Sequence, residues 1–548
     1  MNNDAPLLDV QNLAVPLPAG GDRPFAVKDI SYNIHQGEIV CIVGESGSGK
    51  SVSANAIMGL LPEELTPTNG RIVFQGKDLL QQSQPALRDL RGQHIGMIFQ
   101  EPLSALNPLM TVGRQISEIM QVHDKYPGEQ RRARVLEMLD FVGLPDPALL
   151  YDSYPFRLSG GQRQRVMIAM ALALEPALLI ADEPTTALDM TTQAQILNLI
   201  LRIQAEKGMG VMFITHDFGV VAEIAHRVVV MEKGLTVEQG PVSQVLNEPQ
   251  HPYTKRLIAA VPHAHNAEDG TGRPAVDDSS TPVLEVRNLH KTYVTAGGLL
   301  RKKRVVPAVS DVSFTLRQGE TLGVVGESGS GKSTLGRCLL KLMAFEQGEL
   351  IFNGTDIAPL TEREFRSMRR HMQMVFQDPF SSLNPRHTIG KTISDGPVAN
   401  GVTRGRAQER ARELLKLVGL DASAFNRYPN QFSGGQRQRV GIARALALDP
   451  KLLIADEAVS ALDVSVQAQV LELLNELQQK LRIAMLFITH DLRVAAKVCD
   501  AVIVMHQGKV VEQGPPATIF NDPQHPYTKS LIAAIPGKEW DPSLAKTA

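Results

Sequence analysis

The sequence is poor in cysteine, has no long apolar run and carries almost no net charge, and each absence excludes a class of function. Cys41, Cys338 and Cys499 lie far apart without metal-ligand spacing, which argues against zinc or iron–sulfur sites and favours a reducing compartment. A net charge of −2 offers no general basic field for nucleic acid. No segment approaches the roughly 20 apolar residues that span a bilayer. We therefore expect a cytosolic chain without a secretory signal, for which any membrane role needs a partner.

What the chain does contain is a long internal duplication. The octapeptide GESGSGKS occurs at residues 44–51 and again at 326–333. ADEPTTALD at 181–189 matches ADEAVSALD at 455–463, and FITHD and QHPYTK also recur in the same order. A period this long indicates duplicated domains rather than a solenoid. With 548 residues, 43% of them hydrophobic, each half can bury a core of its own.

Short apolar runs predict an α/β fold in each half. Ile39–Val43 and Thr321–Val325 are typical of buried strands that lead into the octapeptides. Later runs such as Ala177–Ala181 and Val211–Ile214 predict further parallel strands, separated by segments long enough for helices. A polar stretch rich in Gly, Pro, Asp and Ser divides the halves. We therefore expect a first domain at residues 6–263, a linker at 264–282 and a second domain at 283–538.

Each octapeptide fits the phosphate-binding pattern G-x-x-x-x-G-K-[ST]. Its glycines let backbone N–H groups approach a triphosphate, and the helix that follows adds its positive N-terminal end. Lys50 and Lys332 can reach the β- and γ-phosphates, and the hydroxyls of Ser51 and Ser333 suit Mg²⁺. The predicted loop residues are Gly44, Glu45, Ser46, Gly47, Ser48, Gly49, Lys50 and Ser51, with Gly326, Glu327, Ser328, Gly329, Ser330, Gly331, Lys332, Ser333 and Thr334.

Two predicted strands end in adjacent carboxylates, Asp182-Glu183 and Asp456-Glu457. The carboxyl edge of a parallel sheet is where α/β proteins bind ligands. The first carboxylate of each pair can hold the Mg²⁺ shell, and the second can orient and polarise the attacking water.

Histidines and glutamines follow other strands at matching places in both halves. His216 and His490 are expected to contact the γ-phosphate, although a lone histidine after a strand is more often structural. A glutamine at Gln100 or Gln377 can sense metal or water while its loop contacts something else. The predicted catalytic residues are Glu183, Glu457, His216, His490, Gln100 and Gln377. The predicted metal ligands are Ser51, Gln100, Asp182, Ser333, Gln377 and Asp456.

LSGGQRQR at 158–165 and FSGGQRQR at 432–439 are the most specific motifs. Serine followed by two glycines at a helix start leaves N–H groups free to take an anion. Each half already has a phosphate cradle, so a second anion site makes sense if the halves face head to tail. Each signature would then close over the other half's nucleotide, which adds Ser159, Gly160, Gly161, Gln162, Ser433, Gly434, Gly435 and Gln436 to the predicted set.

The order of phosphate loop, glutamine loop, SGGQ signature, Asp-Glu strand end, ALD loop and histidine loop resembles that of ATP-binding cassette ATPases, twice over. The resemblance implies two P-loop NTPase cassette domains, each with a mostly parallel core sheet, an antiparallel β subdomain and a helical subdomain. It also implies ATP and Mg²⁺ held in a nucleotide sandwich, in which each signature completes the opposite site. Tyr293 matches the family's adenine-stacking aromatic, whereas the aligned residue of the first half is Leu17.

The stretches around QHPYTK at 250–255 and 524–529 resemble the C-terminal mark of ATPases from dipeptide, oligopeptide and nickel importers. The chain resembles the fused form of this group, of the glutathione- and oligopeptide-import type. From the residues alone, these stretches are Pro-bearing loops before a short apolar helix, and we expect them to pack the tail of each cassette.

This resemblance implies ATP hydrolysis that powers peptide uptake at the cytoplasmic face of the inner membrane. The implied partners are two integral-membrane permease subunits and an extracytoplasmic substrate-binding protein, with no nucleic acid. The alternative is a soluble tandem cassette ATPase linked to translation or nucleic acid. The cargo stays open among dipeptides, oligopeptides, glutathione, nickel and glycosides.

Overall fold

The computed structural model describes residues 5–18, 20, 23–186, 188–262, 282–295, 304–378, 381–460 and 462–541. They divide into two compact units, one built mainly of residues up to 261 and the other mainly of residues 262–534. The predicted linker at 264–282 lies outside the described residues, except for Pro282, which opens a strand. The exact domain boundaries therefore stay predictions.

The first unit contains two sheets. Its strands are β1 (Leu8–Pro16), β2 (Phe25–Ile34), β3 (Ile39–Val43), β4 (Asn69–Phe74), β5 (Lys77–Asp78), β6 (Ile95–Ile98), β7 (Leu178–Asp182), β8 (Gly210–Thr215), β9 (Arg227–Glu232) and β10 (Leu235–Pro241). Antiparallel strands form one sheet in the order β2-β1-β4-β5, and the other sheet has the order β10-β9-β3-β8-β7-β6. In this core sheet only the edge strand β10 is antiparallel, which confirms the predicted parallel strands.

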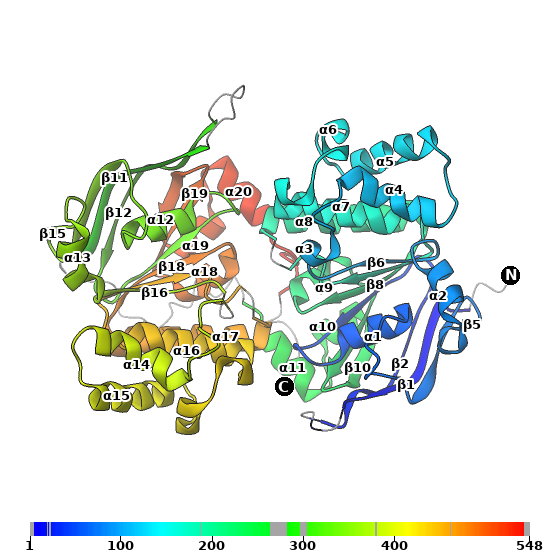
Figure 1. Ribbon diagram of the computed structural model, residues 1–548, viewed down its shortest axis with the longest axis horizontal. Helices are drawn as coiled ribbons and strands as arrows, with labels where there is room; N and C mark the ends of the chain where they lie inside the picture. Colours follow the sequence, from blue (N-terminus) through cyan, green and yellow to red (C-terminus); the bar gives the residue numbers. More distant parts are fainter. Residues whose placement is uncertain are drawn as a thin grey trace. The chain divides into compact units, whose positions relative to one another are not determined.

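Helices surround the core sheet and build a separate subdomain. They are α1 (Lys50–Met58), α2 (Gln84–Leu90), α3 (Pro102–Ala105), α4 (Val112–Val122), α5 (Glu129–Phe141), α6 (Pro147–Tyr151), α7 (Gly160–Leu172), α8 (Met190–Lys207), α9 (Phe218–Ile224), α10 (Val242–Asn247) and α11 (Pro252–Ala259). Helices α4, α5 and α6 pack on one another, and α4 and α5 also pack on α7 (Figure 1). They form the predicted helical subdomain.

The second unit repeats this plan. Its strands are β11 (Pro282–Thr295), β12 (Arg304–Arg317), β13 (Thr321–Val325), β14 (Gln347–Phe352), β15 (Thr355–Asp356), β16 (Met372–Val375), β17 (Leu452–Asp456), β18 (Ala484–Thr489), β19 (Ala501–His506) and β20 (Lys509–Gly514). Its helices are α12 (Lys332–Leu339), α13 (Glu362–Arg369), α14 (Ile389–Ala399), α15 (Arg404–Leu417), α16 (Gly434–Leu446), α17 (Val464–Leu481), α18 (Leu492–Val498), α19 (Pro516–Asn521) and α20 (Pro526–Ala533). The sheet orders are β12-β11-β14-β15 and β16-β17-β18-β13-β19-β20.

The core sheet places the phosphate loop at the end of a buried strand. All five residues of β3 are buried, as expected for a parallel strand that is covered on both faces. The chain leaves β3 through the loop and enters α1 directly after Gly49, whose φ of 102° lies in the left-handed region. Gly331 has a φ of 106° before α12. The lysine of each loop is thereby the first residue of its helix. None of the helices in the described part of the chain is long and apolar enough to cross a bilayer.

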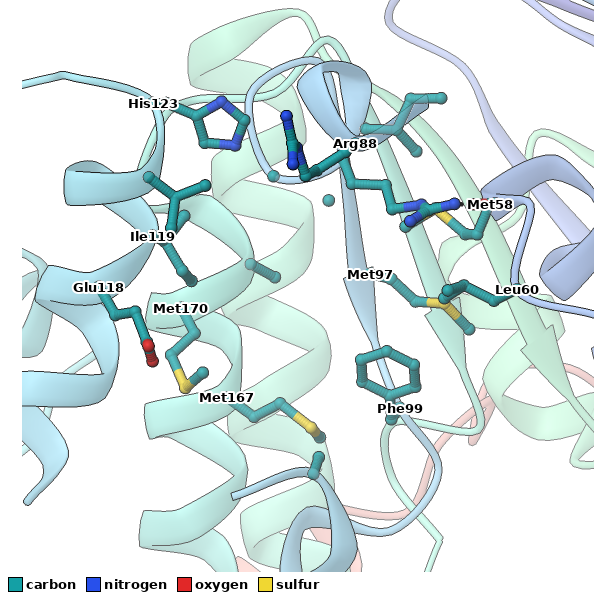
Figure 2. A pocket seen from close by; sticks show the side chains of 17 residues that line it. Met58, Leu60, Arg88, Met97, Phe99, Glu118, Ile119, His123, Met167 and Met170 are labelled. Carbon is teal, nitrogen blue, oxygen red and sulfur yellow. Dashed lines mark hydrogen bonds between the residues drawn. The ribbon is translucent and has the colours of Figure 1, made fainter. Parts of the chain in front are cut away.

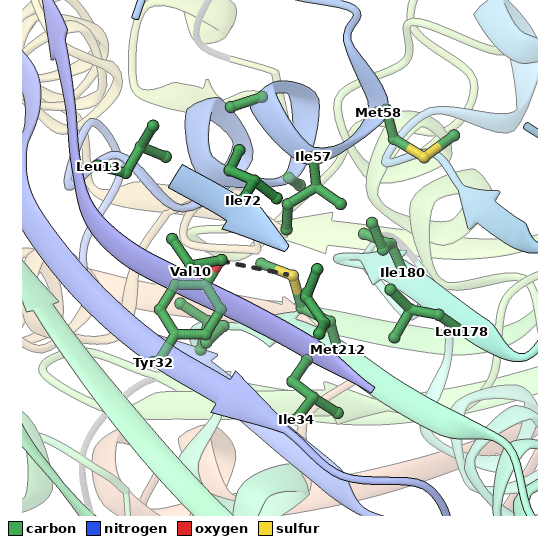
Figure 3. Packing of buried hydrophobic residues seen from close by; sticks show 14 of the residues in the cluster. Val10, Leu13, Tyr32, Ile34, Ile57, Met58, Ile72, Leu178, Ile180 and Met212 are labelled. Carbon is green, nitrogen blue, oxygen red and sulfur yellow. Dashed lines mark hydrogen bonds between the residues drawn. The ribbon is translucent and has the colours of Figure 1, made fainter. Parts of the chain in front are cut away.

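The core of the first unit contains one polar pair that the second unit lacks. The hydroxyls of Tyr32 and Ser53 are 2.5 Å apart and buried, and the Tyr32 hydroxyl also faces Met212 Sδ at 3.9 Å (Figure 3). At the matching positions the second unit has the apolar residues Phe314 and Leu335, both buried. The first copy thus has both polar residues and the second copy has neither, so that no buried hydroxyl of this pair is left without its partner.

We expect Tyr32→Phe to lower the free energy of unfolding by about 1–3 kcal/mol, since Ser53 keeps a buried hydroxyl without its partner. Adding Ser53→Ala removes that hydroxyl and should recover part of the loss. Urea denaturation of the full chain measures both changes. Equal stability of wild type and Tyr32→Phe would show that the pair contributes nothing.

Candidate functional site

The start of each phosphate loop is packed so closely that only glycine fits. Gly44 has a φ of 153°, and a Cβ there would lie 2.2 Å from the carbonyl oxygen of Met231 in β9 of the core sheet. Gly326 repeats this arrangement, with a φ of 151° and the Met505 oxygen at 2.2 Å. The loop then opens toward solvent, where Ser46 and Gly47 are exposed. Gly44 therefore allows the loop to pack closely, and Gly47 lies at its accessible tip.

The lysine of each loop is buried and held by backbone carbonyls. Lys50 Nζ donates to the carbonyl oxygens of Gly44 at 2.8 Å and Glu45 at 3.0 Å. Lys332 donates in the same way at 2.7 and 2.8 Å, and burial lowers its pKa. The ammonium is thus a fixed positive charge beside the loop, as an anion site requires.

One hydroxyl in each loop lacks a partner. Among the described residues, the buried side-chain oxygens of Ser48 and Ser330 make no hydrogen bond. A buried polar group without a partner costs free energy, and an anion in the loop would satisfy it. These atoms fit the predicted triphosphate.

A serine and an aspartate meet beside each loop. Ser51 Oγ donates to Asp182 Oδ1 at 3.0 Å, and Ser333 Oγ donates to Asp456 Oδ1 at 2.9 Å. Burial raises the pKa of both aspartates, while the serine hydrogen bond opposes the rise. Oxygen donors are the ligands that Mg²⁺ prefers, so these pairs fit that ion. Because each pair supplies few ligands, Mg²⁺ would need the phosphate oxygens as well.

The second carboxylate of each pair belongs to a residue with a left-handed backbone conformation. Successive side chains of a strand point to opposite faces, so two adjacent carboxylates can share a site only if the chain bends between them. Glu183 and Glu457 both have a φ of 47°, in the left-handed region that non-glycine residues rarely adopt. Their N–H groups donate to the carbonyls of Ile214 and Ile488, which holds the bend in place. Such strain is typical of functional positions.

Three side chains surround Glu183. Gln100 Nε2 and Thr186 Oγ1 each donate to its Oε2 at 3.0 Å, and His216 Nδ1 lies 3.5 Å from Oε1. Burial alone would raise the pKa of Glu183, but the His216 hydrogen bond and charge, with the charge of Lys50, outweigh it and lower the pKa to about 2. Because so acidic a carboxylate is a weak base, this glutamate is suited to orient water.

Two of these three contacts recur at Glu457, whereas Ser460, which stands in place of Thr186, donates to the backbone carbonyl of Glu457 instead. Gln377 Nε2 donates to the Glu457 carboxylate at 2.7 Å, and His490 Nδ1 lies 3.5 Å away. Burial opposes both charges, yet their mutual attraction lowers the pKa of Glu457 and raises that of His490. The structure thus brings together the predicted Gln, Glu and His of each half.

The signature turns start helices and have no hydrogen bond to their own phosphate loop among the described contacts. Ser159 caps α7 in a capping box with Gln162, and Ser433 caps α16 with Gln436 in the same way. Ser159 and Gly160 are exposed, and no atom lies within 4 Å of a Cβ placed on Gly160. The turn is therefore formed and open.

The second glycine of each signature is explained by packing within its own cassette. A Cβ on Gly161 would lie 2.6 Å from Cγ2 of Thr192 at the start of α8, and one on Gly435 would lie 2.2 Å from Val466 Cγ1. Such distances force a shift in the neighbour. Packing therefore requires glycine at position 161. It does not require glycine at position 160.

The position predicted to stack on adenine differs between the halves. The Tyr293 hydroxyl lies 3.3 Å from Thr334 Oγ1 and 3.0 Å from Met343 Sδ, and the side chain is 40% exposed. In the first half, the N–H of Leu17 pairs with the carbonyl of Pro24. The guanidinium of Arg23 donates to the carbonyls of Gly47 and Phe25. Sequence reasoning missed Arg23, because one arginine in a loop carries no motif.

Sequence reasoning also missed two tyrosines of the HPYT stretches. The predicted short helices are confirmed as α11 and α20. The hydroxyl oxygens of Tyr253 and Tyr527 each accept the loop N–H of Glu45 or Glu327 at 3.0 Å. The sequence does not predict this contact, because each tyrosine lies about a whole cassette away from its loop along the chain.

Comparisons with known proteins agree with this geometry. The sequence model of the family described as "ABC transporter" matches residues 27–186 and 309–460. The one described as "Oligopeptide/dipeptide transporter, C-terminal region" matches residues 237–283 and 511–546. Both match twice, as the duplication predicts.

Curated relatives match nearly the whole chain. "Peptidoglycan transport ATP-binding protein YejF" of Agrobacterium fabrum is 49% identical over 537 residues, which cover 97% of each chain. "Glutathione import ATP-binding protein GsiA" of Shigella boydii is 48% identical over 566 residues, or 97% of this chain and 90% of the relative. The protein of the same name from Pectobacterium atrosepticum is 46% identical, with 97% and 89% covered.

The two signature glycines give a test of the packing argument. Gly161→Ala should destabilise the first cassette by about 1–3 kcal/mol, because its methyl group overlaps Thr192. Thr192→Ser removes the overlapping Cγ2 and should relieve the loss in the double variant. Gly160→Ala should leave the midpoint of urea unfolding unchanged. An equal loss in Gly160→Ala and Gly161→Ala would refute the distinction.

Proposed function

Because the chain belongs to the ABC transporter family and is an ATPase, we propose that it drives uptake of peptides or peptide-like molecules such as glutathione. Two observations support this cargo class. The C-terminal region of oligopeptide and dipeptide transporters matches both cassettes. Relatives that match nearly the whole chain are named for glutathione import and peptidoglycan transport.

In each cassette we assign the residues as follows. Lys50 neutralises the β- and γ-phosphates, and the loop N–H groups with Ser48 hold their oxygens. Ser51 and Asp182 would hold Mg²⁺, which supplies charge neutralisation for phosphoryl transfer when it is bound. The second cassette uses the matching residues Lys332, Ser330, Ser333 and Asp456.

Around the γ-phosphate we assign roles to three side chains. Glu183 orients the attacking water, because its pKa of about 2 keeps it ionised and a weak base. Gln100 donates to that carboxylate, and we also assign it to the metal shell. His216, next to the same carboxylate, contacts the γ-phosphate. Glu457, Gln377 and His490 have these roles in the second cassette.

We further propose that each nucleotide is completed by the opposite signature. A signature turn is an exposed, capped helix start, and Gly160 has no packing need of its own. Exposed N–H groups at a helix start favour an anion. Ser433, Gly435 and Gln436 would close over the first site, and Ser159, Gly161 and Gln162 over the second, while Tyr293 stacks on adenine in the second.

The glutamate assignment has a direct test. Glu183→Gln with Glu457→Gln should lower kcat for ATP hydrolysis by at least about 100-fold, since the amide no longer polarises water. ATP binding should persist, because the loop lysines are untouched. Steady-state ATPase assays and binding of radiolabelled ATP measure the two properties. Wild-type turnover in this double variant would remove the assignment.

We propose that a separate permease subunit docks beside Gln100. A cavity of about 330 Å³ lies between α1, β6, α4 and α7, and its lining is rich in methionine: Met58, Met97, Met167 and Met170 (Figure 2). Phe99, directly before Gln100, faces it and is 41% exposed. Flexible methionines suit an apolar helix face. Arg88 and His123 lie at one end, which fits a helix with an acidic residue there.

This groove sits next to a residue that contacts the catalytic glutamate. Movement of a docked helix would therefore shift Gln100. In return, ATP hydrolysis would change the position of the helix. We propose two such permeases, with an extracytoplasmic binding protein that delivers the cargo. The chain would work at the cytoplasmic face of the membrane, attached through the permeases.

Ile119→Glu tests the groove, because it places a charge in the apolar lining. We expect at least a roughly tenfold loss of permease retained in detergent pull-downs, with ATP binding unchanged. Leu149→Glu is the matched control, since Leu149 is 66% exposed on α6 outside the groove. Normal recovery of the permease with Ile119→Glu would contradict this docking site.

A further inference from the structure

The C-terminal HPYT helices touch the loops that bind nucleotide. In the first cassette, the hydroxyl oxygen of Tyr253 accepts the N–H of Glu45, the residue directly after the first loop glycine. Tyr253 is only 3% exposed, so this bond is shielded from water. In the second cassette, Tyr527 accepts the N–H of Glu327 at the same 3.0 Å. The two copies thus keep one contact between regions that are far apart in the sequence.

The surroundings of the two tyrosines differ, although the bond is the same. The Arg256 guanidinium lies 5.7 Å from the Tyr253 ring centre and pairs with Glu232. In the second cassette, the His506 ring packs on Tyr527 with centres 3.9 Å apart. The hydroxyl contact is therefore the shared feature, and the ring contacts are free to vary.

Each tyrosine is itself held firmly. Glu238 accepts the N–H groups of Gln250 and His251, at 2.7 and 3.1 Å. His251 Nδ1 then accepts the N–H of Tyr253 and caps α11. Glu512, Gln524 and His525 repeat these bonds before α20. The motif thus fixes the position of the tyrosine that follows it.

The loop residue that the tyrosine holds also holds the lysine. The carbonyl oxygen of Glu45 accepts Lys50 Nζ at 3.0 Å and the Ser48 N–H at 3.1 Å. Its N–H faces Tyr253, so both polar groups of this residue are engaged. In the second cassette, Lys332 Nζ lies 2.8 Å from the Glu327 carbonyl oxygen. The carbonyl of this residue is therefore one of the two oxygens that hold the ammonium.

We propose that Tyr253 and Tyr527 are positioning residues for nucleotide binding, which act through Glu45 and Glu327 on Lys50 and Lys332. The proposal rests on the phosphate-binding role assigned to these lysines. Without the hydroxyl, the loop N–H loses its acceptor and the loop spends less time in the binding conformation. Apparent affinity falls in proportion to that population. Turnover of bound nucleotide stays the same, because the hydroxyl contacts that the described residues show are with the phosphate loops.

Tyr253→Phe with Tyr527→Phe, in the full chain, keeps the rings and removes only the hydroxyls. We expect Kd for radiolabelled ATP and KM to rise about three- to tenfold, with kcat within about twofold of wild type. Arg256→Met is one control, because it alters the ring contact and keeps the hydroxyl. Tyr151→Phe, in the helical subdomain, is a second. Both should bind ATP normally.

A purely structural role would lower the melting temperature and leave Kd and KM unchanged, and that result would overturn the proposal. Lys50→Ala with Lys332→Ala tests the phosphate-binding role of the lysines separately from the positioning role of the tyrosines. If it binds no ATP while the tyrosine variant binds normally, only the positioning role is wrong. If the lysine variant binds ATP as wild type does, the phosphate site is wrong and the positioning role falls with it.

Discussion

The close packing of each phosphate loop against its core sheet is the constraint on which the rest of the site depends. Each core sheet ends its buried central strand at a loop whose first glycine is pressed against the Met231 or Met505 carbonyl. That packing leaves the lysine at the first turn of the helix, tied to loop carbonyls, with an unpartnered serine hydroxyl beside it. The Asp-Glu pair, the glutamine and the histidine then gather at the same edge because parallel strands end there together.

Duplication gives the chain two such centres and allows them to diverge. The contacts of Gln and His with the glutamate are nearly the same in both copies. Away from them the copies differ, as in Tyr32 with Ser53 against Phe314 with Leu335, or Tyr293 against Leu17. The contacts beside the phosphate loops are thus kept, whereas the core accepts alternatives that keep packing and polar partners satisfied.

Much of this was predictable from sequence, because the decisive signals are local. Apolar runs such as Ile39–Val43 predicted the strands, and motifs predicted Lys50, Ser51 and Asp182 as neighbours. Contacts made by a bend or by distant segments were not predictable. The left-handed φ of Glu183 has no sequence signature, and Tyr253 meets Glu45 only after the cassette has folded. The HPYT stretches were expected to pack as a tail, yet they also reach the phosphate loop.

The most direct measurement concerns which signature serves which loop. Lys50→Ala combined with Ser433→Arg damages a single proposed site, so the chain should still retain one ATP, measured by equilibrium binding in the presence of Mg²⁺. Lys50→Ala combined with Ser159→Arg damages both proposed sites and should retain none. The opposite pattern, with one ATP retained by the second variant and none by the first, would show that each cassette completes its own site.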